Sequence, residues 1–329
     1  MPYKIEELDF KRDVKGEQVR TRKIFENLKE KAINNIKLTE HEKDFFCLGV
    51  KLSQLEDGFV KDYDCCENFR FKSLYLTYFK DLTGKSTYEK VRGTYLYNPS
   101  VFEIKKDLKF LDLIKEKWYK TINITKHREK LLSEISKEVR NDLKELEKKK
   151  GKLFFRRDKE KYTLNKKKIL LQSKYIYCIS LQIFELFDNK EFIITLNKTK
   201  IEINEFSIIH ILNRHFAEIT KVNTTKTFHN EDFEPKLLSK KLKDIFNEID
   251  NSGIYAGESI NKISFQYNGT DYQIWVNKRI KQIKGKGNVE FNRLETFYPL
   301  KDQQELTKLS TNYDLHKIND DLYVYKKKL

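Results

Sequence analysis

Residues 262–278 read Lys-Ile-Ser-Phe-Gln-Tyr-Asn-Gly-Thr-Asp-Tyr-Gln-Ile-Trp-Val-Asn-Lys, and this stretch decides the fold of the C-terminal part of the chain. Apolar and polar residues alternate on both sides of Asn268-Gly269, and Asn-Gly in that setting is the strongest short signal for a β-hairpin. We therefore predict strands at Lys262–Tyr267 and Tyr272–Lys278. Successive strand residues face opposite sides of a sheet, so Lys278 and its neighbour Arg279 are expected on different faces.

Short strands and helices are also predicted on either side of this hairpin. They are two strands within Phe192–Ile203, a helix at Glu205–Ile219 with Asn204 as its N-cap, a helix from Pro235 to Ile249 that ends at Asn251-Ser252-Gly253, a strand at Asn288–Tyr298, a helix at Gln303–Leu309 and a strand at Leu322–Tyr325. This order predicts an α+β domain, in which two helices pack on an antiparallel sheet, and not a βαβ nucleotide-binding fold.

The preceding part of the chain is predicted to be largely helical. Apolar residues at three-to-four spacing indicate helices at Arg22–Ile36, Glu40–Gln54 (with Thr39 and Glu42 as a capping box) and Phe102–Ile122. We therefore expect two parts, a mostly helical region at residues 1–188 and an α+β domain at residues 189–329.

The charge of the chain is strongly positive and unevenly distributed. It has 329 residues, a net charge of +16 and 13% aromatic residues, which argues against a disordered basic tail. Residues 140–169 contain 13 Lys/Arg and five Asp/Glu, so half of the excess charge lies in thirty residues. This stretch is expected to end one helix, break at Gly151 and continue as a charged connector. It is either a solvated helix face or an arm that neutralises phosphates.

The sequence lacks the motifs of several classes of protein. No apolar run reaches the roughly 18–20 residues of a membrane helix, and the N-terminus has no apolar leader, so no membrane partner is expected. The four cysteines form no Cys-x-x-Cys pair. Thr83-Gly84-Lys85-Ser86 resembles the end of a phosphate-binding loop, but Phe79 stands where the pattern needs glycine. We expect a cytoplasmic protein without a metal or other cofactor.

The predicted helix after Asn204 carries the most informative side chains. At 100° per residue one face is apolar: Ile208, Ile209, Leu212, Phe216 and Ile219. Ser207, His210 and Arg214 fall on the opposite face, with His215 at the border. His210 and Arg214 are four residues apart and therefore neighbours. The guanidinium would keep the imidazole available as a base and could grip a phosphate, unless this is simply a solvated helix face.

The motif His210-Ile-x-x-Arg214-His215, on a helix entered from a strand, resembles the barnase–EndoU–colicin–RelE group of metal-independent nucleases, especially its phage-associated and polymorphic-toxin branches. The resemblance covers roughly residues 190–300 and continues through the second helix into the late strand Arg293–Pro299. It implies an endoribonuclease that acts as a toxin or phage-defence effector.

In these enzymes a Thr or Ser with a nearby aromatic hydroxyl lies on a late strand, opposite the helix that carries the histidine. Here Thr296 and Tyr298 resemble that pair. Strand alternation predicts that both side chains share one face. Lys278 or Arg279 would take the place of the lysine that some branches use.

Metal-free RNA cleavage needs a base for the 2′-hydroxyl, an acid for the leaving 5′ oxygen and cations for the transition state. His210 and His215 are the candidates for base and acid, with His210 preferred for its place beside Arg214. Arg214, with Lys278 or Arg279, would stabilise the phosphorane-like state. The product would be a 2′,3′-cyclic phosphate.

Further contacts to RNA (tRNA or mRNA) are expected from basic segments. Arg279, Lys284 and Lys286 lie in or beside the Gly-rich segment Lys281–Asn288, which is expected to be a loop, and Arg156 and Arg157 lie in the basic stretch at 140–169. The N-terminal region would receive an inhibitor or an activating partner. The alternative is a non-catalytic nucleic-acid-binding protein that uses a basic, aromatic-rich surface; a protein-interaction module is a third hypothesis.

Overall fold

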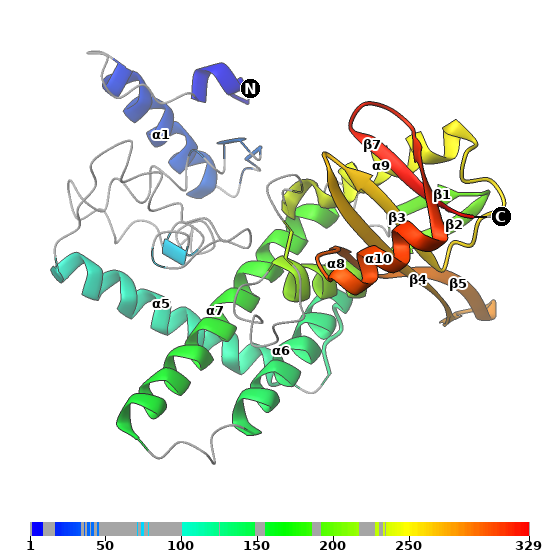
Figure 1. Cartoon of the computed structure of the whole chain (residues 1–329). Coiled ribbons are helices and arrows are strands. Elements are labelled where there is room, and N and C mark those ends of the chain that lie inside the picture. The colour runs from blue at the N-terminus through cyan, green and yellow to red at the C-terminus, as the bar shows by residue number, and fades with distance from the viewer. Residues whose placement is uncertain are drawn as a thin grey trace. The chain divides into compact units, whose positions relative to one another are not determined.

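The computed structural model describes residues 2–8, 17–33, 101–124, 126–148, 155–185, 192–216 and 235–328, with isolated residues between 36 and 78 and at 228, 229 and 233. Contacts divide the chain into a first unit, Met1–Asp81 with Lys85–Lys117, and a second unit, Trp118–Leu329 with Leu82–Gly84. The predicted α+β class is confirmed. Helices dominate the N-terminal region, and the C-terminal part holds a mainly antiparallel sheet with helices (Figure 1).

The first unit is helical where it is described. It contains η1 (Ile5–Leu8), α1 (Glu17–Ile33) and the part of α5 (Val101–Ile122) that ends at Lys117. One face of α1 is buried in a small apolar cluster with Leu38. The predicted capping box is confirmed: the backbone N–H of Thr39 donates to the Glu42 carboxylate at 2.8 Å, and that of Glu42 donates to Thr39 Oγ1 at 3.3 Å.

Two long helices, α6 (Lys130–Lys148) and α7 (Arg156–Glu185), pack side by side in the second unit (Figure 1). The expectation of a charged connector through residue 169 is therefore wrong, because the basic stretch re-enters a helix at Arg156. Both helices also pack against α8 (Glu205–Ile211), the helix that carries His210. The predicted boundary at 188/189 therefore falls inside this unit.

Within the described residues the sheet has seven strands in the order β1-β2-β5-β4-β3-β7-β6. Their bounds are β1 Phe192–Leu196, β2 Thr199–Ile203, β3 Lys262–Tyr267, β4 Thr270–Ile283, β5 Gly287–Pro299, β6 Tyr313–Lys317 and β7 Leu322–Lys327. All neighbouring pairs are antiparallel except β2 and β5, which run parallel. The turn at Asn268-Gly269 is confirmed, with φ values of 47° and 72° that suit a hairpin.

Two faces of β4 and β5 differ in character. The apolar face carries Tyr272, Ile274 and Phe297, all fully buried, and α9 (Leu238–Ser252) packs on that side. We call the opposite side the polar face; it carries Gln273, Trp275, Thr296 and Tyr298. The register of β4 and β5 shifts between Trp275 and Val276, so Glu295 is an extra residue on β5. The bulge keeps Thr296 on the polar face and Leu294 on the apolar one.

Other parts of the structure differ from the sequence prediction or fall outside the description. The segment 281–288 is not a loop, since β4 continues to Ile283 and β5 begins at Gly287. The edge strand β6 was not predicted. The Thr83–Ser86 motif and most of the predicted helix at 40–54 lie outside the described residues. Within the described part, no helix combines the length and apolar character needed to cross a bilayer.

Candidate active site

The helix α8 packs along the part of the β5 edge that has no strand beside it. β2 pairs with β5 only at Asn292 and Arg293, after which the chain leaves the sheet and forms α8 (Glu205–Ile211). Asn204 caps this helix as predicted. Ser207, expected on an exposed face, is instead fully buried, and its hydroxyl donates to the carbonyl oxygen of Leu294 at 2.5 Å. The helix therefore replaces a strand at this edge.

A π-helical turn at Leu212–Phe216 follows α8 and carries His215. Its Nε2 lies 2.9 Å from Thr296 Oγ1, within hydrogen-bonding distance. The imidazole also stacks on the Tyr298 ring, with 5.2 Å between the centroids. Three residues predicted from the sequence, one on the helix and two on the late strand, thus come together at the edge of the polar face.

Gln273 joins these side chains to an indole. Its amide oxygen accepts from the Tyr298 hydroxyl at 2.7 Å and from Trp275 Nε1 at 2.9 Å, and its amide nitrogen donates to Ser264 Oγ at 3.2 Å. Gln273 is buried, whereas Trp275 remains 41% exposed. The network fixes the Tyr298 hydroxyl and leaves an aromatic surface open beside it. We call His215, Gln273, Trp275, Thr296 and Tyr298 the His215 cluster.

Protonation of two groups near the cluster follows from burial. Burial raises the pKa of Tyr298, partly offset by the hydrogen bond from the Trp275 indole, so its phenol keeps its proton at neutral pH. Burial lowers the pKa of His229 to about 3, against the opposing hydrogen bond to the Phe297 carbonyl. His229 is therefore neutral, and it stacks on Phe216 and supports the turn that carries His215 from the apolar side.

Several basic residues lie on the polar face, among them Lys262 and Arg279. Lys262 pairs with Trp275 across the hairpin, and its Nζ lies 5.5 Å from the centre of the Trp275 ring. Arg279 lies on the same face further along β4 and pairs with Glu295 at 2.7 Å. Lys278 follows Val276 on the other face, so of the two cations left open by the sequence it is Arg279 that shares the face of the His215 cluster.

His210 and Arg214 lie elsewhere. Arg214 pairs with Glu138 of α6 at 2.9 Å and lies 3.8 Å from Asp142, and His210 Nδ1 is 3.7 Å from Glu138. Burial would raise the pKa of Glu138, but the nearby His210 and the charge and hydrogen bond of Arg214 outweigh it and lower the pKa to about 2. The structure therefore does not bring these two residues to Thr296, and their described contacts join the helix to α6.

The other predicted nucleic-acid contacts are exposed. Lys284 and Lys286 lie in the turn between β4 and β5, with Gly285 between them. Arg156 and Arg157 begin α7, where Arg156 pairs with Glu160 at 2.9 Å. These side chains are not part of the His215 cluster.

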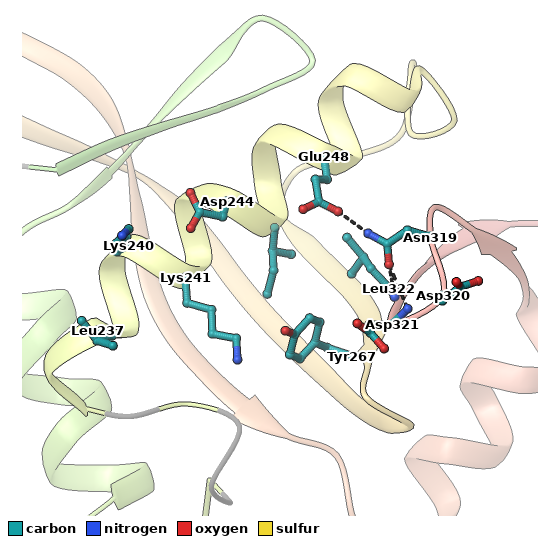
Figure 2. A pocket seen from close by; sticks show the side chains of 11 residues that line it. Leu237, Lys240, Lys241, Asp244, Glu248, Tyr267, Asn319, Asp320, Asp321 and Leu322 are labelled. Carbon is teal, nitrogen blue, oxygen red and sulfur yellow. Dashed lines mark hydrogen bonds between the residues drawn. The ribbon is translucent and has the colours of Figure 1, made fainter. Parts of the chain in front are cut away.

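A separate groove of about 590 Å³ lies between α9 and the turn that joins β6 to β7 (Figure 2). Some of its polar groups are engaged with one another: Glu248 accepts from Asn319, and Lys241 lies over the Tyr267 ring at 4.5 Å. None of the residues predicted for the site lines this groove. The candidate chemistry is therefore assigned to the His215 cluster.

Sequence reasoning missed Lys262 and Gln273 as members of the site. The hairpin turn could have predicted both, because a two-residue turn at Asn268-Gly269 fixes the strand register. That register places Lys262 opposite Trp275 and Ser264 opposite Gln273. Strand alternation then places both pairs on the face of Trp275.

Among the described residues, no three His, Cys, Asp or Glu side chains gather as they would around a metal ion. Comparison of the chain with protein-family models, with curated proteins and with solved structures gave no match.

Proposed function

We propose that the protein is a metal-independent endoribonuclease that cleaves cytoplasmic RNA at the His215 cluster. The observation that carries the proposal is the contact of 2.9 Å between His215 Nε2 and Thr296 Oγ1, beside the Tyr298 ring. An imidazole held against a hydroxyl and stacked on a phenol ring is suited to move a proton next to a phosphate. The nuclease resemblance extends the proposal to a toxin or phage-defence effector.

In this mechanism His215 takes the proton of the ribose 2′-hydroxyl, whose oxygen attacks the adjacent phosphorus. The bond from phosphorus to the 5′ oxygen breaks, and that oxygen takes a proton from water, so the products are a 2′,3′-cyclic phosphate and a 5′-hydroxyl. The protonated His215 then returns its proton to the hydroxide left in the solvent. The Thr296 hydroxyl donates a hydrogen bond to a phosphate oxygen. The Tyr298 hydroxyl donates to Gln273, so Tyr298 positions the His215 imidazole that stacks on its ring. Lys262 and Arg279 add positive charge on the same face.

The test is cleavage in EDTA. We expect purified protein to cut end-labelled tRNA or mRNA in EDTA and to leave 2′,3′-cyclic phosphate ends, identified by their conversion to 3′-phosphates in acid. Cleavage only with added divalent metal, or 3′-hydroxyl ends, would contradict the proposed chemistry.

Trp275 is expected to stack on a base next to the cleaved bond, because its ring is 41% exposed beside the His215 cluster. Base stacking on an aromatic side chain contributes about 1–3 kcal/mol. Trp275→Ala should therefore raise KM for a short RNA by about tenfold or more, while Trp275→Phe, which retains a ring, should raise it less. Equal KM values for the two variants would show that no base stacks there.

Non-catalytic nucleic-acid binding is the second candidate. It is favoured by the exposed lysines Lys278, Lys284 and Lys286, for which no ion pair is found within the described residues. This function predicts RNA or DNA binding without cleavage by the wild-type protein, and binding that His215→Gln leaves unchanged.

A further inference from the structure

The distal halves of β4 and β5 form a two-stranded extension, which we call the ribbon: Lys278–Ile283, the turn Lys284–Lys286 and Gly287–Phe291. β3 pairs with β4 only as far as Trp275, and β2 pairs with β5 only at Asn292 and Arg293. Beyond these points β4 and β5 pair with each other alone. Figure 1 shows this pair projecting past the other strands.

The ribbon is basic and open to solvent. Residues 278–291 contain five Lys/Arg and one Glu, a net charge of +4. Arg279 and Lys281 are held by Glu295 and Glu202, at 2.7 and 2.5 Å. Lys278, Lys284 and Lys286 are exposed and have no ion pair among the described residues. Three lysines are thus available to a polyanion.

The tip of the ribbon can approach a polyanion closely. Gly285 and Gly287 have φ values of +82° and +72°, and a side chain at either position would be strained. Nothing lies within 4 Å of where a Cβ would stand at either glycine. The turn therefore presents backbone and two lysines with no bulky side chain between them.

The ribbon has no open aromatic platform. Its one aromatic residue, Phe291, is half-buried and covered by the Lys281 ammonium at 4.8 Å. Proteins that hold single strands stack the bases on aromatic rings, whereas duplexes are held through phosphates and 2′-hydroxyls. Lysine and amide side chains without such rings suit a base-paired backbone, while exposed Trp275, at the base of the ribbon, suits an unpaired base.

We propose that the ribbon docks on the base-paired stem of an RNA whose adjacent unpaired nucleotide is cleaved at the His215 cluster. This inference rests on the proposed function and names the substrate class of the same site. From Trp275 to Lys284 is nine strand residues, roughly 30 Å, so the stem contact and the cleavage point are held apart by one continuous strand.

The experiment compares two RNAs of equal length that share one unpaired target segment. In the first RNA the segment is the loop of a stem; in the second the stem is abolished by scrambling one strand. Three proteins are used: wild type, the ribbon variant Lys278→Ala/Lys284→Ala/Lys286→Ala, and the charge-matched control Lys240→Ala/Lys308→Ala/Lys327→Ala. Binding is measured between about 50 and 200 mM salt with proteins that also carry His215→Gln. Cleavage is measured in EDTA with proteins that retain His215.

We expect the ribbon variant to lose at least about tenfold in affinity for the stem–loop RNA. The slope of log K against log salt concentration should be smaller in magnitude by about two to three, since up to three phosphate contacts are removed. Its affinity for the unpaired RNA should change about threefold or less, and the control should behave as wild type. Unchanged thermal unfolding would show that the ribbon variant is folded.

Equal losses on both RNAs, or no loss on either, would overturn the ribbon inference while cleavage by wild type in EDTA still supports the nuclease. Tight stem binding that does not prefer RNA over a DNA stem–loop of the same sequence would overturn it also. Absence of cleavage of both RNAs by wild type would remove the proposed function and this inference with it.

Discussion

His215→Gln should slow RNA cleavage in EDTA by at least about 100-fold, because general acid–base catalysis contributes about 10²–10⁴ to such reactions. Glutamine retains polar contact with Thr296 but cannot move a proton. The measurement is the initial rate on an end-labelled RNA at saturating protein, so that the chemical step is observed instead of binding.

Two other histidines make this test specific. His316→Gln, on the edge strand β6, should leave the rate unchanged. His210→Gln tests the residue preferred from the sequence: its effect should be small at a temperature where the variant is folded, since His210 faces Glu138. Loss of cleavage with His210→Gln and retention with His215→Gln would contradict the assignment of the site.

Glu138→Gln should destabilise the protein by about 3 kcal/mol at neutral pH. The side chain of Glu138 is 14% exposed, and Arg214 and His210 lie against it. Removal of one partner from a buried ion pair costs about 3–5 kcal/mol, and the lower end is expected because Asp142 still lies 3.8 Å from Arg214. The pKa of Glu138, lowered from 4.5 to about 2, corresponds to a similar free energy. The measurement is urea unfolding of wild type and variant.

The pH dependence has a definite sign. The folded pKa of Glu138 lies below the unfolded one, so the stabilisation is present above about pH 4.5 and is lost as the pH falls toward 2. The difference in stability between wild type and Glu138→Gln should therefore shrink over this range. Glu145→Gln, on the same helix but in the exposed pair with Lys148, is the matched control and should cost less than about 1 kcal/mol. Equal effects of the two variants would contradict the role of Glu138.

Local signals predicted much of the sheet and three of the five side chains of the His215 cluster. Asn268-Gly269 determines the hairpin register, and the two-residue period places Thr296 and Tyr298 on one face, as the structure has them. Asn204 was predicted as an N-cap because its side chain acts within one helical turn. These features depend on neighbours in sequence, which is why they could be predicted.

The choice between His210 and His215 depended on distant contacts. The 100° rule assumes a regular α-helix, whereas the turn at Leu212–Phe216 is π-helical, so the rule does not extend from His210 to His215. The face expected to be solvated is covered by α6, whose Glu138 and Asp142 lie more than 70 residues earlier in the chain. No local pattern reveals which helix will cover another.

The β4–β5 bulge and the edge strand β6 have a similar cause. Glu295 is set apart by a register shift that pairing creates, and Tyr313–Lys317 becomes a strand only because β7 pairs with it. Propensity at either place is too weak to indicate the outcome.

The pairing of β2 with β5 affects the point in folding at which the His215 cluster forms. His215 and Thr296 are 81 residues apart, and Ser207 reaches Leu294 across 87 residues, so the edge of β5 forms through non-local contacts. Such contacts form late in folding, after local hairpins and helices. A nascent chain still lacking β5 on the ribosome has the histidine helix but neither hydroxyl. In the proposed function such a chain cannot yet cleave RNA, and the His215 cluster is completed only once β5 has been synthesised.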